Sequence, residues 1–465
     1  MEIISVFDMF KIGIGPSSSH TLGPWKAANR FLLENPGNIS KISVELYGSL
    51  SLTGKGHATD IAIVMGLLSQ IPEEIFPETI PRLLEEVKTS KRLNLRGESS
   101  IPFSFEKDIK FCKKALPFHS NGLRFIAQID EKEVIETFYS IGGGFVIKEN
   151  ENIRDAQSKS IPYPIQNGAE LLAHCEKTGL SISELVLQNE LALHTEEYID
   201  TQIKKIWEVM ESCVFIGCTT SGILPGGLNV KRRAADFYKN LEGPEIVKNK
   251  KEWLKKLRKT KVKFRQILKW VSCFAIGVNE VNASLGKVVT APTNGSSGVI
   301  PAVIMYYLMI EDHKAGLPEI KRFLLVAGEI GSIFKKGATI SAAMGGCQAE
   351  IGVSSAMAAA ALCELLGGSP EQVLVAAEIA MEHHLGMTCD PIMGLVQIPC
   401  IERNSMGAMK AITAAELALG TDPKAAKVPL DKVVSTMWQT AKDMKTKYKE
   451  TSKGGLALGV NAIGC

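Results

Sequence analysis

The sequence lacks the features that would assign it to a membrane or to a highly charged partner. Its 465 residues carry a formal net charge of only +3, so the overall charge indicates no particular partner. The apolar N-terminal stretch contains Asp8 and Lys11 and no small-residue cleavage site, so we expect no signal peptide. The longest uncharged run, residues 288–310, is strongly apolar over only about a dozen residues, too few to span a bilayer. We expect a soluble, cytoplasmic protein with no membrane partner.

Nucleotide-binding signals are also missing. Residues 231–269 carry fifteen Lys or Arg and four acidic residues, but no aromatic side chains in register with these charges for base stacking. We interpret this segment as a solvated helical face and expect no nucleic-acid partner. The stretch GSLSLTGKG is not a phosphate loop, because Gly56 stands where that motif requires Ser or Thr.

The ten cysteines include no closely spaced C-x2-C pair, which argues against a typical zinc site and a ferredoxin-type cysteine run. Their irregular spacing, without a signal peptide, indicates a reducing compartment in which thiols serve metal binding or chemistry. Six lie within apolar or helical patterns, and we expect them to be packing residues: Cys112, Cys175, Cys213, Cys218, Cys273 and Cys363.

Three other cysteines lie outside such patterns. Ser369 and Gln372 form a capping box for a helix that ends at Gly386, and Cys389 and Cys400 follow in a segment broken by proline and glycine. Cys347 lies beside another helix start, where the helix dipole favours a thiolate. The trio is compatible with zinc, an iron–sulfur cluster, a nucleophile or no function, and its wide spacing suits a cluster with one open iron.

Composition changes along the chain and predicts two domains. Residues 1–150 mix helical and alternating patterns, which predicts an α+β domain with helices over 24–33 and 60–68 and strands over 41–47, 122–129 and 134–139. A polar, proline-broken stretch follows, and we place a linker at 151–170. Residues 171–465 are helical in pattern and rich in small residues, which predicts an all-α domain that carries Cys347, Cys389 and Cys400.

Eight stretches in order along the chain resemble the bacterial iron–sulfur L-serine dehydratases of the single-chain type. They are IGIGPSSSHTLGP, LYGSLSLTGKGHATD, FHSNGLRF, GCTTSGILPGGLNVKRR, NEVNASLGKVVTAPTNGSSGVIPA, GGCQAEIGVSSAMAAAA, HHLGMTCDPIMGLVQIPCIERN and YKETSKGGLA. The resemblance implies an oxygen-sensitive [4Fe–4S] cluster, no pyridoxal phosphate, L-serine as substrate, and pyruvate and ammonia as products. It also implies an N-terminal domain like an allosteric substrate-binding module, and we expect a homodimer.

The resemblance also assigns residues to roles. Cys347, Cys389 and Cys400 match the cluster ligands, and His20 and His57 are candidates for the base that removes the Cα proton. Two polar segments are candidates for binding the substrate carboxylate, and they contain Ser17, Ser18, Ser19, Thr21, Thr293, Asn294, Gly295 and Ser296. His383 and His384 are candidates for supporting the cluster by hydrogen bonds.

The chain ends on Cys465 after an apolar, glycine-broken tail. A C-terminal cysteine carries an α-carboxylate and a β-thiol, so it mimics L-serine with sulfur in place of the hydroxyl. We predict that Cys465 is the fourth cluster ligand at rest and that L-serine displaces it.

Three other functions stay open at this stage. A pyridoxal-phosphate dehydratase would use an aldimine lysine, and the TNGSSG loop is compatible with that cofactor. A metal-stabilised amino-acid sensor would bind serine without turnover. A related lyase would act on cysteine or another hydroxy acid, and the choice between serine and threonine is also open.

Overall fold

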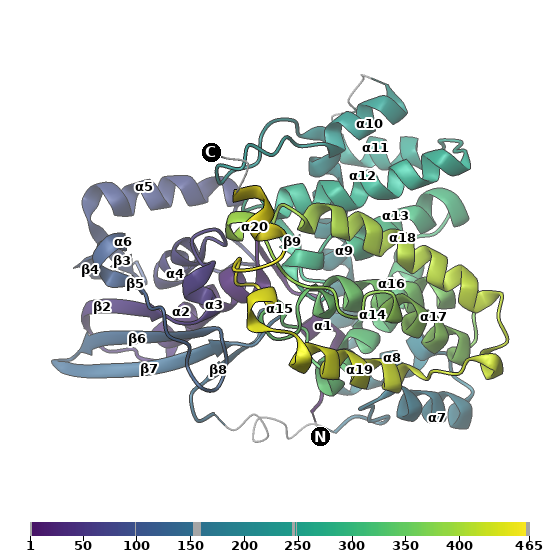
Figure 1. The fold of residues 1–465 in the computed structure, drawn as a ribbon, viewed down its shortest axis with the longest axis horizontal. Coiled ribbons are helices and arrows are strands. Elements are labelled where there is room, and N and C mark those ends of the chain that lie inside the picture. Colours follow the sequence, from purple (N-terminus) through teal and green to yellow (C-terminus); the bar gives the residue numbers. More distant parts are fainter. Residues whose placement is uncertain (1, 98, 152–159, 244–246, 248, 462–465) are drawn as a thin grey trace.

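The computed structural model describes residues 2–97, 99–151, 160–243, 247 and 249–461. Figure 1 shows a part that contains the main sheet, in purple and blue, beside a larger helical part in teal, green and yellow. The predicted order, an α+β region followed by a helical region, is confirmed. Among the described residues after 160, the only strand is β9 (Lys287–Val289).

The main sheet has five strands in the order β5-β2-β6-β7-β8, with only β2 and β5 parallel. Side chains alternate along β2, where Ile42, Val44 and Leu46 are buried and their neighbours are more exposed, so one face of the sheet is apolar. The helices α2 (Gly23–Glu34) and α4 (Thr59–Leu67) cover this face, as Figure 1 shows. The strands are β2 (Ile39–Leu46), β5 (Ile109–Phe111), β6 (Gly122–Ile129), β7 (Lys132–Ser140) and β8 (Val146–Lys148).

The strands predicted over 122–129 and 134–139 are present as β6 and β7, and they form a hairpin. Its two loop residues, Asp130 and Glu131, have φ values of 48° and 68°, the left-handed conformation that a tight hairpin turn requires at both positions. Smaller elements complete this part: α3 (Ser49–Leu52), α5 (Ile80–Ser90), β3 (Arg92–Leu95), β4 (Ser99–Pro102) and α6 (Phe105–Asp108).

The helical part is organised around α16 (Ile351–Leu365), which is buried on all sides from Ile351 to Glu364. Its many alanines let neighbouring helices approach closely. Glycines allow a similarly close approach between α9 (Glu196–Thr219) and α12 (Phe264–Asn282), because a Cβ on Gly217 would overlap the backbone of Gly277. The remaining longer helices are α7 (Gly168–Thr178), α8 (Ile182–Leu193), α10 (Ala234–Glu242), α11 (Lys250–Leu257), α13 (Val299–Tyr306), α14 (Leu317–Gly337), α17 (Pro370–Glu382), α18 (Cys400–Leu419) and α19 (Leu430–Asp443), with the short α15 (Ala342–Gly345) and α20 (Leu456–Asn461).

The start of the chain packs into the helical part. Val6 and Met9 of α1 (Val6–Met9) belong to the large helical core, and Val6 lies against Gly328 of α14. The next strand, β1 (Ile12–Ile14), pairs antiparallel with β9. The chain therefore crosses from the helical part into the sheet-containing part just before residue 17. The domain boundary at 150 and the linker at 151–170 stay predictions, and residues 152–159 lie outside the described residues.

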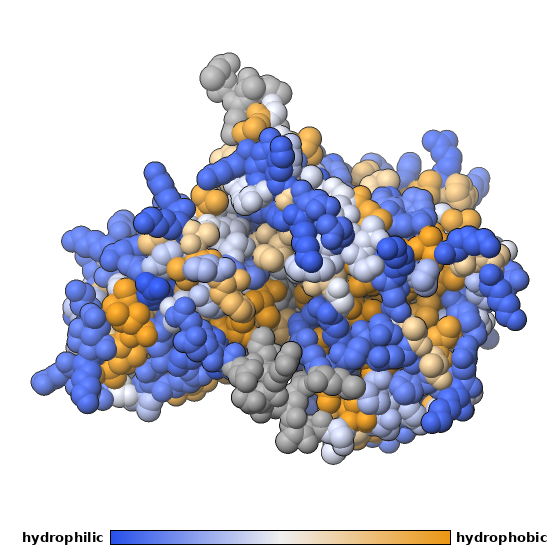
Figure 2. All heavy atoms as spheres, turned by 60° about the horizontal axis from the view of Figure 1, so that its bottom comes forward, coloured by the Kyte–Doolittle hydropathy of each residue, from blue (hydrophilic) through white to orange (hydrophobic). Residues whose placement is uncertain are grey.

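The surface is mostly polar on the face drawn in Figure 2, where hydrophobic side chains gather in separate patches. Among the described residues, no helix is both long and apolar enough to cross a membrane.

Candidate active site

Two histidines stack at the boundary between the two parts. His20 lies in a π-helical turn (Ser18–Leu22) whose start is capped by Ser17 Oγ, which accepts a hydrogen bond from the His20 backbone N–H at 3.1 Å. His57 lies in the turn between α3 and α4. The ring centroids are 4.5 Å apart with an interplanar angle of 28°, and the two residues are 0% and 1% exposed. Residues 37 positions apart in the chain (57 − 20) thus form one buried pair.

Two threonine hydroxyls join these turns by hydrogen bonds. Thr21 Oγ1 donates to the carbonyl oxygen of His57 at 2.7 Å, and Thr59 Oγ1 donates to the carbonyl oxygen of His20 at 2.7 Å. Each hydroxyl comes from the turn that carries the other histidine, so the rings are held at a defined separation.

Glu450 brings the end of the helical part to the histidine pair. Its Oε1 lies 3.4 Å from His20 Nδ1 and 3.7 Å from His57 Nε2. Its backbone is in the left-handed region, with φ 55°, a strained conformation for a residue with a side chain. Sequence reasoning gave Glu450 no role, although it lies within the stretch YKETSKGGLA that carried part of the family resemblance.

The hydrogen bonds define the tautomers of both histidines. His57 Nδ1 lies 3.0 Å from the carbonyl oxygen of Thr53, which can only accept, so a neutral His57 carries its proton on Nδ1 and its lone pair on Nε2. Ser49 Oγ donates to the Glu450 carbonyl oxygen at 2.8 Å and therefore accepts from His20 Nε2 at 3.0 Å. His20 then has its lone pair on Nδ1. Both lone pairs face the Glu450 carboxyl group.

Burial shifts the pKa values of these three groups in the direction that favours their neutral forms. It lowers the pKa of His57 to about 4 and that of His20 well below its usual value, with the neighbouring His57 adding to the effect. Burial also raises the pKa of Glu450 well above its usual value, and the charges of Glu350 and Cys347 act in the same direction. Burial thus favours the unprotonated form of both imidazoles and disfavours the charged form of the Glu450 carboxyl group.

The three predicted ligand cysteines lie close together in the helical part. Cys347 begins a 3-10 turn (Cys347–Ala349), Cys389 lies in the loop after α17, and Cys400 is the first residue of α18. All three are buried, with exposures of 2%, 4% and 8%, and none forms a disulfide. The ligand atoms of Cys347, Cys389 and Glu350 lie within 4.8 Å of one another.

Arg403 supplies positive charge to this trio. Its guanidinium donates to Cys347 Sγ at 3.1 Å, to the Thr388 carbonyl oxygen at 2.7 Å and to Asp390 Oδ1 at 3.2 Å. Burial alone would lower the pKa of Arg403. The electrostatic attraction of the neighbouring cysteines is stronger than this effect and raises the pKa above its usual value. The guanidinium is therefore charged although it is mostly buried beside the cysteines.

The thiol nearest Arg403 is the one most easily ionised. A hydrogen bond from the Cys389 thiol is the main cause that lowers the pKa of Cys347 to about 6, against burial and with help from Arg403. The pKa of Cys389 is raised by the same contact, and that of Cys400 is raised by burial. Burial and the charge of Cys347 raise the pKa of Glu350 to about 8.

These donors fit an iron–sulfur cluster. Thiolates are the soft ligands that such clusters use, and three reduced thiols gather around a permanent cation that can offset the anionic charge of a cluster. Cys465, the predicted fourth ligand, lies outside the described residues.

The two histidines after α17 make other contacts. His383 Nδ1 donates to the Ile379 carbonyl oxygen at 2.8 Å, and His384 Nδ1 donates to the Ala380 carbonyl oxygen at 2.6 Å. The His383 side chain is 58% exposed. The hydrogen bonds seen among the described residues thus tie both rings to the preceding helical turn.

The cysteine trio and the histidine pair are joined through the backbone. Glu450 N donates to the Cys389 carbonyl oxygen at 2.9 Å, and Cys389 N donates to the Tyr448 carbonyl oxygen at 2.8 Å. Asp390 Oδ2 then accepts from the backbone N–H of Leu456, the first residue of α20, at 2.6 Å. In Figure 1 this yellow C-terminal segment runs along the boundary between the two parts.

The predicted substrate-binding residues are all buried at this boundary, but most already have partners. Thr293 Oγ1 lies 3.1 Å from Ser296 Oγ, which donates to the Ala291 carbonyl oxygen at 2.9 Å, while Ser17 and Thr21 hold the histidine turns. Ser18 Oγ and Asn294 Oδ1 have no hydrogen-bond partner among the described residues. Within this set, these two atoms are available to a ligand. The roles of Ser19 and Gly295 also stay predictions.

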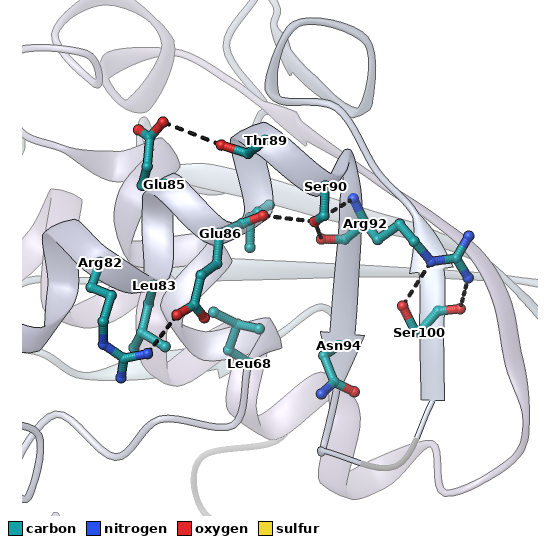
Figure 3. A pocket seen from close by; sticks show the side chains of 11 residues that line it. Leu68, Arg82, Leu83, Glu85, Glu86, Thr89, Ser90, Arg92, Asn94 and Ser100 are labelled. Atoms are coloured by element: carbon teal, nitrogen blue, oxygen red, sulfur yellow. Dashed lines mark hydrogen bonds and ion pairs between the residues drawn. The ribbon is translucent and has the colours of Figure 1, made fainter.

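A cavity of about 630 Å³ lies elsewhere, between α5 and the β3–β4 hairpin. Figure 3 shows that its polar side chains bind one another or nearby backbone: Arg82 with Glu86, Thr89 with Glu85, and Arg92 with Ser100. Its side chains thus supply few free groups for a ligand.

Comparisons with known proteins match both parts of the chain. A family model described as serine dehydratase beta chain matches residues 5–151, and one described as serine dehydratase alpha chain matches residues 177–457. L-serine dehydratase 1 of Escherichia coli (strain K12) is 47% identical, covering 98% of this chain and 99% of the relative. L-serine dehydratase of Streptomyces coelicolor is 48% identical, covering 99% of this chain and 100% of the relative. L-serine dehydratase of Haemophilus influenzae is 45% identical, covering 98% and 99%.

Proposed function

The chain belongs to the serine dehydratase family, and from this premise we propose that it is an L-serine ammonia-lyase that converts L-serine to pyruvate and ammonia. The proposal rests on one observation: candidate acid–base residues and candidate metal ligands lie next to each other in one buried region. A pair of neutral histidines is held through Glu450 beside the trio Cys347, Cys389 and Cys400.

The three cysteines would hold a [4Fe–4S] cluster. When bound, the cluster supplies a Lewis-acidic iron that makes the serine β-hydroxyl a competent leaving group. Arg403 balances the charge of the thiolates, and the buried position of the trio restricts access of water and oxygen. No pyridoxal phosphate is needed for this reaction scheme.

The Cα proton would be removed by His57, with His20 as the alternative base. The Nδ1 proton of His57 is committed to the Thr53 carbonyl oxygen, so its Nε2 lone pair is available and the ring cannot turn away without losing that bond. Protonation of His57 would place an N–H next to Glu450 Oε1, which can accept it. Glu450 would thus act as a positioning residue that stabilises the protonated base.

The serine carboxylate would bind on the polar turns at the boundary. Ser18 and Asn294 have atoms without a partner among the described residues, while Ser17, Thr21, Thr293 and Ser296 hold the backbone of these turns. Ser19 and Gly295 complete the two segments. The aminoacrylate product would tautomerise and hydrolyse to pyruvate and ammonia.

Cys465 would occupy the fourth ligand position at rest. Its carboxylate and thiol reproduce the carboxylate and hydroxyl of L-serine, so substrate and tail would compete for one site. Because the tail is tethered, its effective concentration favours binding, and serine would have to displace it. We also propose a cytoplasmic homodimer.

The test is an anaerobic iron and sulfide analysis of the full-length protein, paired with a serine-to-pyruvate assay. We expect about four irons and four sulfides per chain, the composition of a [4Fe–4S] cluster, together with pyruvate formation. Borohydride trapping of a lysine adduct would instead support a pyridoxal-phosphate enzyme. Serine binding without turnover would support the sensor function, and turnover of cysteine or threonine in preference to serine would support a related lyase.

A further inference from the structure

A second group of buried polar atoms lies at the end of the main sheet, beside the histidine pair. Asn121 is 0% exposed, and among the described residues neither its Oδ1 nor its Nδ2 has a hydrogen-bond partner. The hydroxyls of Ser120 and Ser140 are also buried without a partner in this part of the chain. Ser120 and Asn121 lie in the stretch FHSNGLRF, whose sequence alone indicates no role for them.

Backbone contacts place these residues against the proposed site. The Ser120 carbonyl oxygen accepts from Ser49 N at 2.8 Å, and the Ser49 hydroxyl contacts both His20 and Glu450. Ser140 N donates to the Asn121 carbonyl oxygen at 3.0 Å, at the point where β6 begins and β7 ends. Asn121 therefore directly follows a residue that contacts Ser49, and Ser49 hydrogen-bonds His20, the alternative base.

Ser140 lies between Asn121 and two other segments of the site, the His20 turn and the loop before Thr293. Its hydroxyl lies so close to Gly23, at the end of the His20 turn, that a Cβ on this glycine would overlap it. The glycine loop that follows Ser140 meets the helical part: Gly142 lies against Ser341, and Gly143 lies against the carbonyl oxygen of Pro292. Pro292 directly precedes the polar segment that begins at Thr293.

An unpaired amide in such a position is costly to the folded protein. A buried amide normally has its donors and acceptor satisfied, and leaving them unpaired destabilises the fold. The same chain satisfies Asn189, which is also buried: its Oδ1 accepts from Tyr163 N at 2.9 Å, and its Nδ2 donates to the Tyr163 carbonyl oxygen at 2.7 Å. The contrast indicates that the Asn121 amide forms its hydrogen bonds with a ligand.

We propose that Asn121, assisted by the Ser140 hydroxyl, binds the α-amino and α-carboxylate groups of the amino-acid substrate. An amide suits both groups, because Oδ1 accepts from an ammonium and Nδ2 donates to a carboxylate. His119 Nδ1 accepts from Asn121 N at 3.0 Å and holds the backbone in place. The inference rests on the proposed function, and it adds Asn121, at the end of the sheet, to Ser18 and Asn294 as groups that bind the substrate.

The test compares Asn121→Ala and Asn121→Asp with the wild type, using anaerobically prepared holoenzyme. Two ligands are measured: L-serine as substrate, and 3-hydroxypropionate, which is serine without its amino group, as competitive inhibitor. For Asn121→Ala we expect KM for serine to rise by about 10- to 100-fold, the effect of losing hydrogen bonds to charged groups. The inhibition constant of 3-hydroxypropionate should rise less, because this ligand has no ammonium to lose.

Asn121→Asp keeps the hydrogen-bond acceptor and repels the substrate carboxylate. It should therefore weaken the binding of 3-hydroxypropionate at least as much as that of serine. Neither substitution removes a side-chain hydrogen bond seen among the described residues. The melting temperature of Asn121→Ala should therefore be unchanged or raised. The matched control, Asn189→Ala, removes two hydrogen bonds to Tyr163, so it should lower the melting temperature and leave KM unchanged.

The outcomes separate this inference from the proposed function. An active wild type with unchanged KM and unchanged inhibition in folded Asn121→Ala and Asn121→Asp would overturn the role of Asn121 alone. A wild type that contains its cluster but makes no pyruvate from serine would overturn both. A melting temperature of Asn121→Ala that falls as far as that of Asn189→Ala, with KM unchanged, would make Asn121 a structural residue and overturn the inference.

Discussion

The substitution His57→Asn tests the proposed base with little disturbance of the fold. The Asn side chain places an N–H donor near the position of His57 Nδ1, so it can keep the hydrogen bond to the Thr53 carbonyl oxygen, now 3.0 Å long. It removes Nε2, the atom that carries the lone pair and lies 3.7 Å from Glu450 Oε1. The perturbation is thus directed at proton transfer.

The magnitudes of the two effects differ. The loss of ring stacking on His20, whose centroid lies 4.5 Å away, should lower the free energy of unfolding by about 1 kcal/mol. Loss of a general base should lower kcat by roughly 10²- to 10⁴-fold, which corresponds to about 3–5 kcal/mol in the activation free energy. A large fall in kcat with a small change in stability is the expected result.

The assay is anaerobic pyruvate formation by cluster-loaded enzyme, together with the exchange of the serine Cα hydrogen with solvent. His383→Asn is the matched control, because His383 Nδ1 makes the same bond to the carbonyl oxygen four residues earlier but its side chain is 58% exposed. We expect this control to keep the wild-type kcat. If His57→Asn keeps more than about a tenth of kcat and exchanges the Cα hydrogen normally, His57 is not the base. His20→Asn would then be the next variant to measure.

Three further predictions address the cluster, the tail and the pH dependence of stability. Cys389→Ser should lose iron, sulfide and activity, whereas Cys363→Ser, a change in a buried cysteine of α16, should keep all three; a full iron content in Cys389→Ser would contradict the ligand assignment. Cys465→Ser should assemble the cluster but lose it faster in air and respond differently to serine; unchanged oxygen sensitivity and kinetics would rule out the tail as a ligand. Burial raises the pKa of Glu190 to about 7, so the folded state binds more protons than the unfolded state between pH 4.5 and 7, and the free energy of unfolding falls as pH rises through this window. Glu190→Gln should remove up to about 3 kcal/mol of this fall, as measured by urea unfolding at pH 5 and pH 8; an unchanged pH dependence would show that Glu190 does not titrate in this range.

The sequence determined the features that depend on residues close together in the chain. The alternation along β2, the two strands on either side of the turn at Asp130 and Glu131, and the capping box of Ser369 and Gln372 all agree with the structure. Each depends on interactions that span a few residues, so a local pattern is sufficient to predict it. The positions of Cys347, Cys389 and Cys400 came from the family resemblance; the structure places the ligand atoms of Cys347 and Cys389 within 4.8 Å of each other and all three cysteines near enough to Arg403 to raise its pKa.

Only the tertiary structure decided how the site is assembled. The sequence offered His20 and His57 as alternative bases, but the structure stacks them and sets Glu450 beside both. It also packs the start of the chain into the helical core and leaves Asn121 buried without a partner among the described residues. No local pattern encodes these relations, because they join segments as far apart as residues 20 and 450 and exist only after both parts of the protein have packed together.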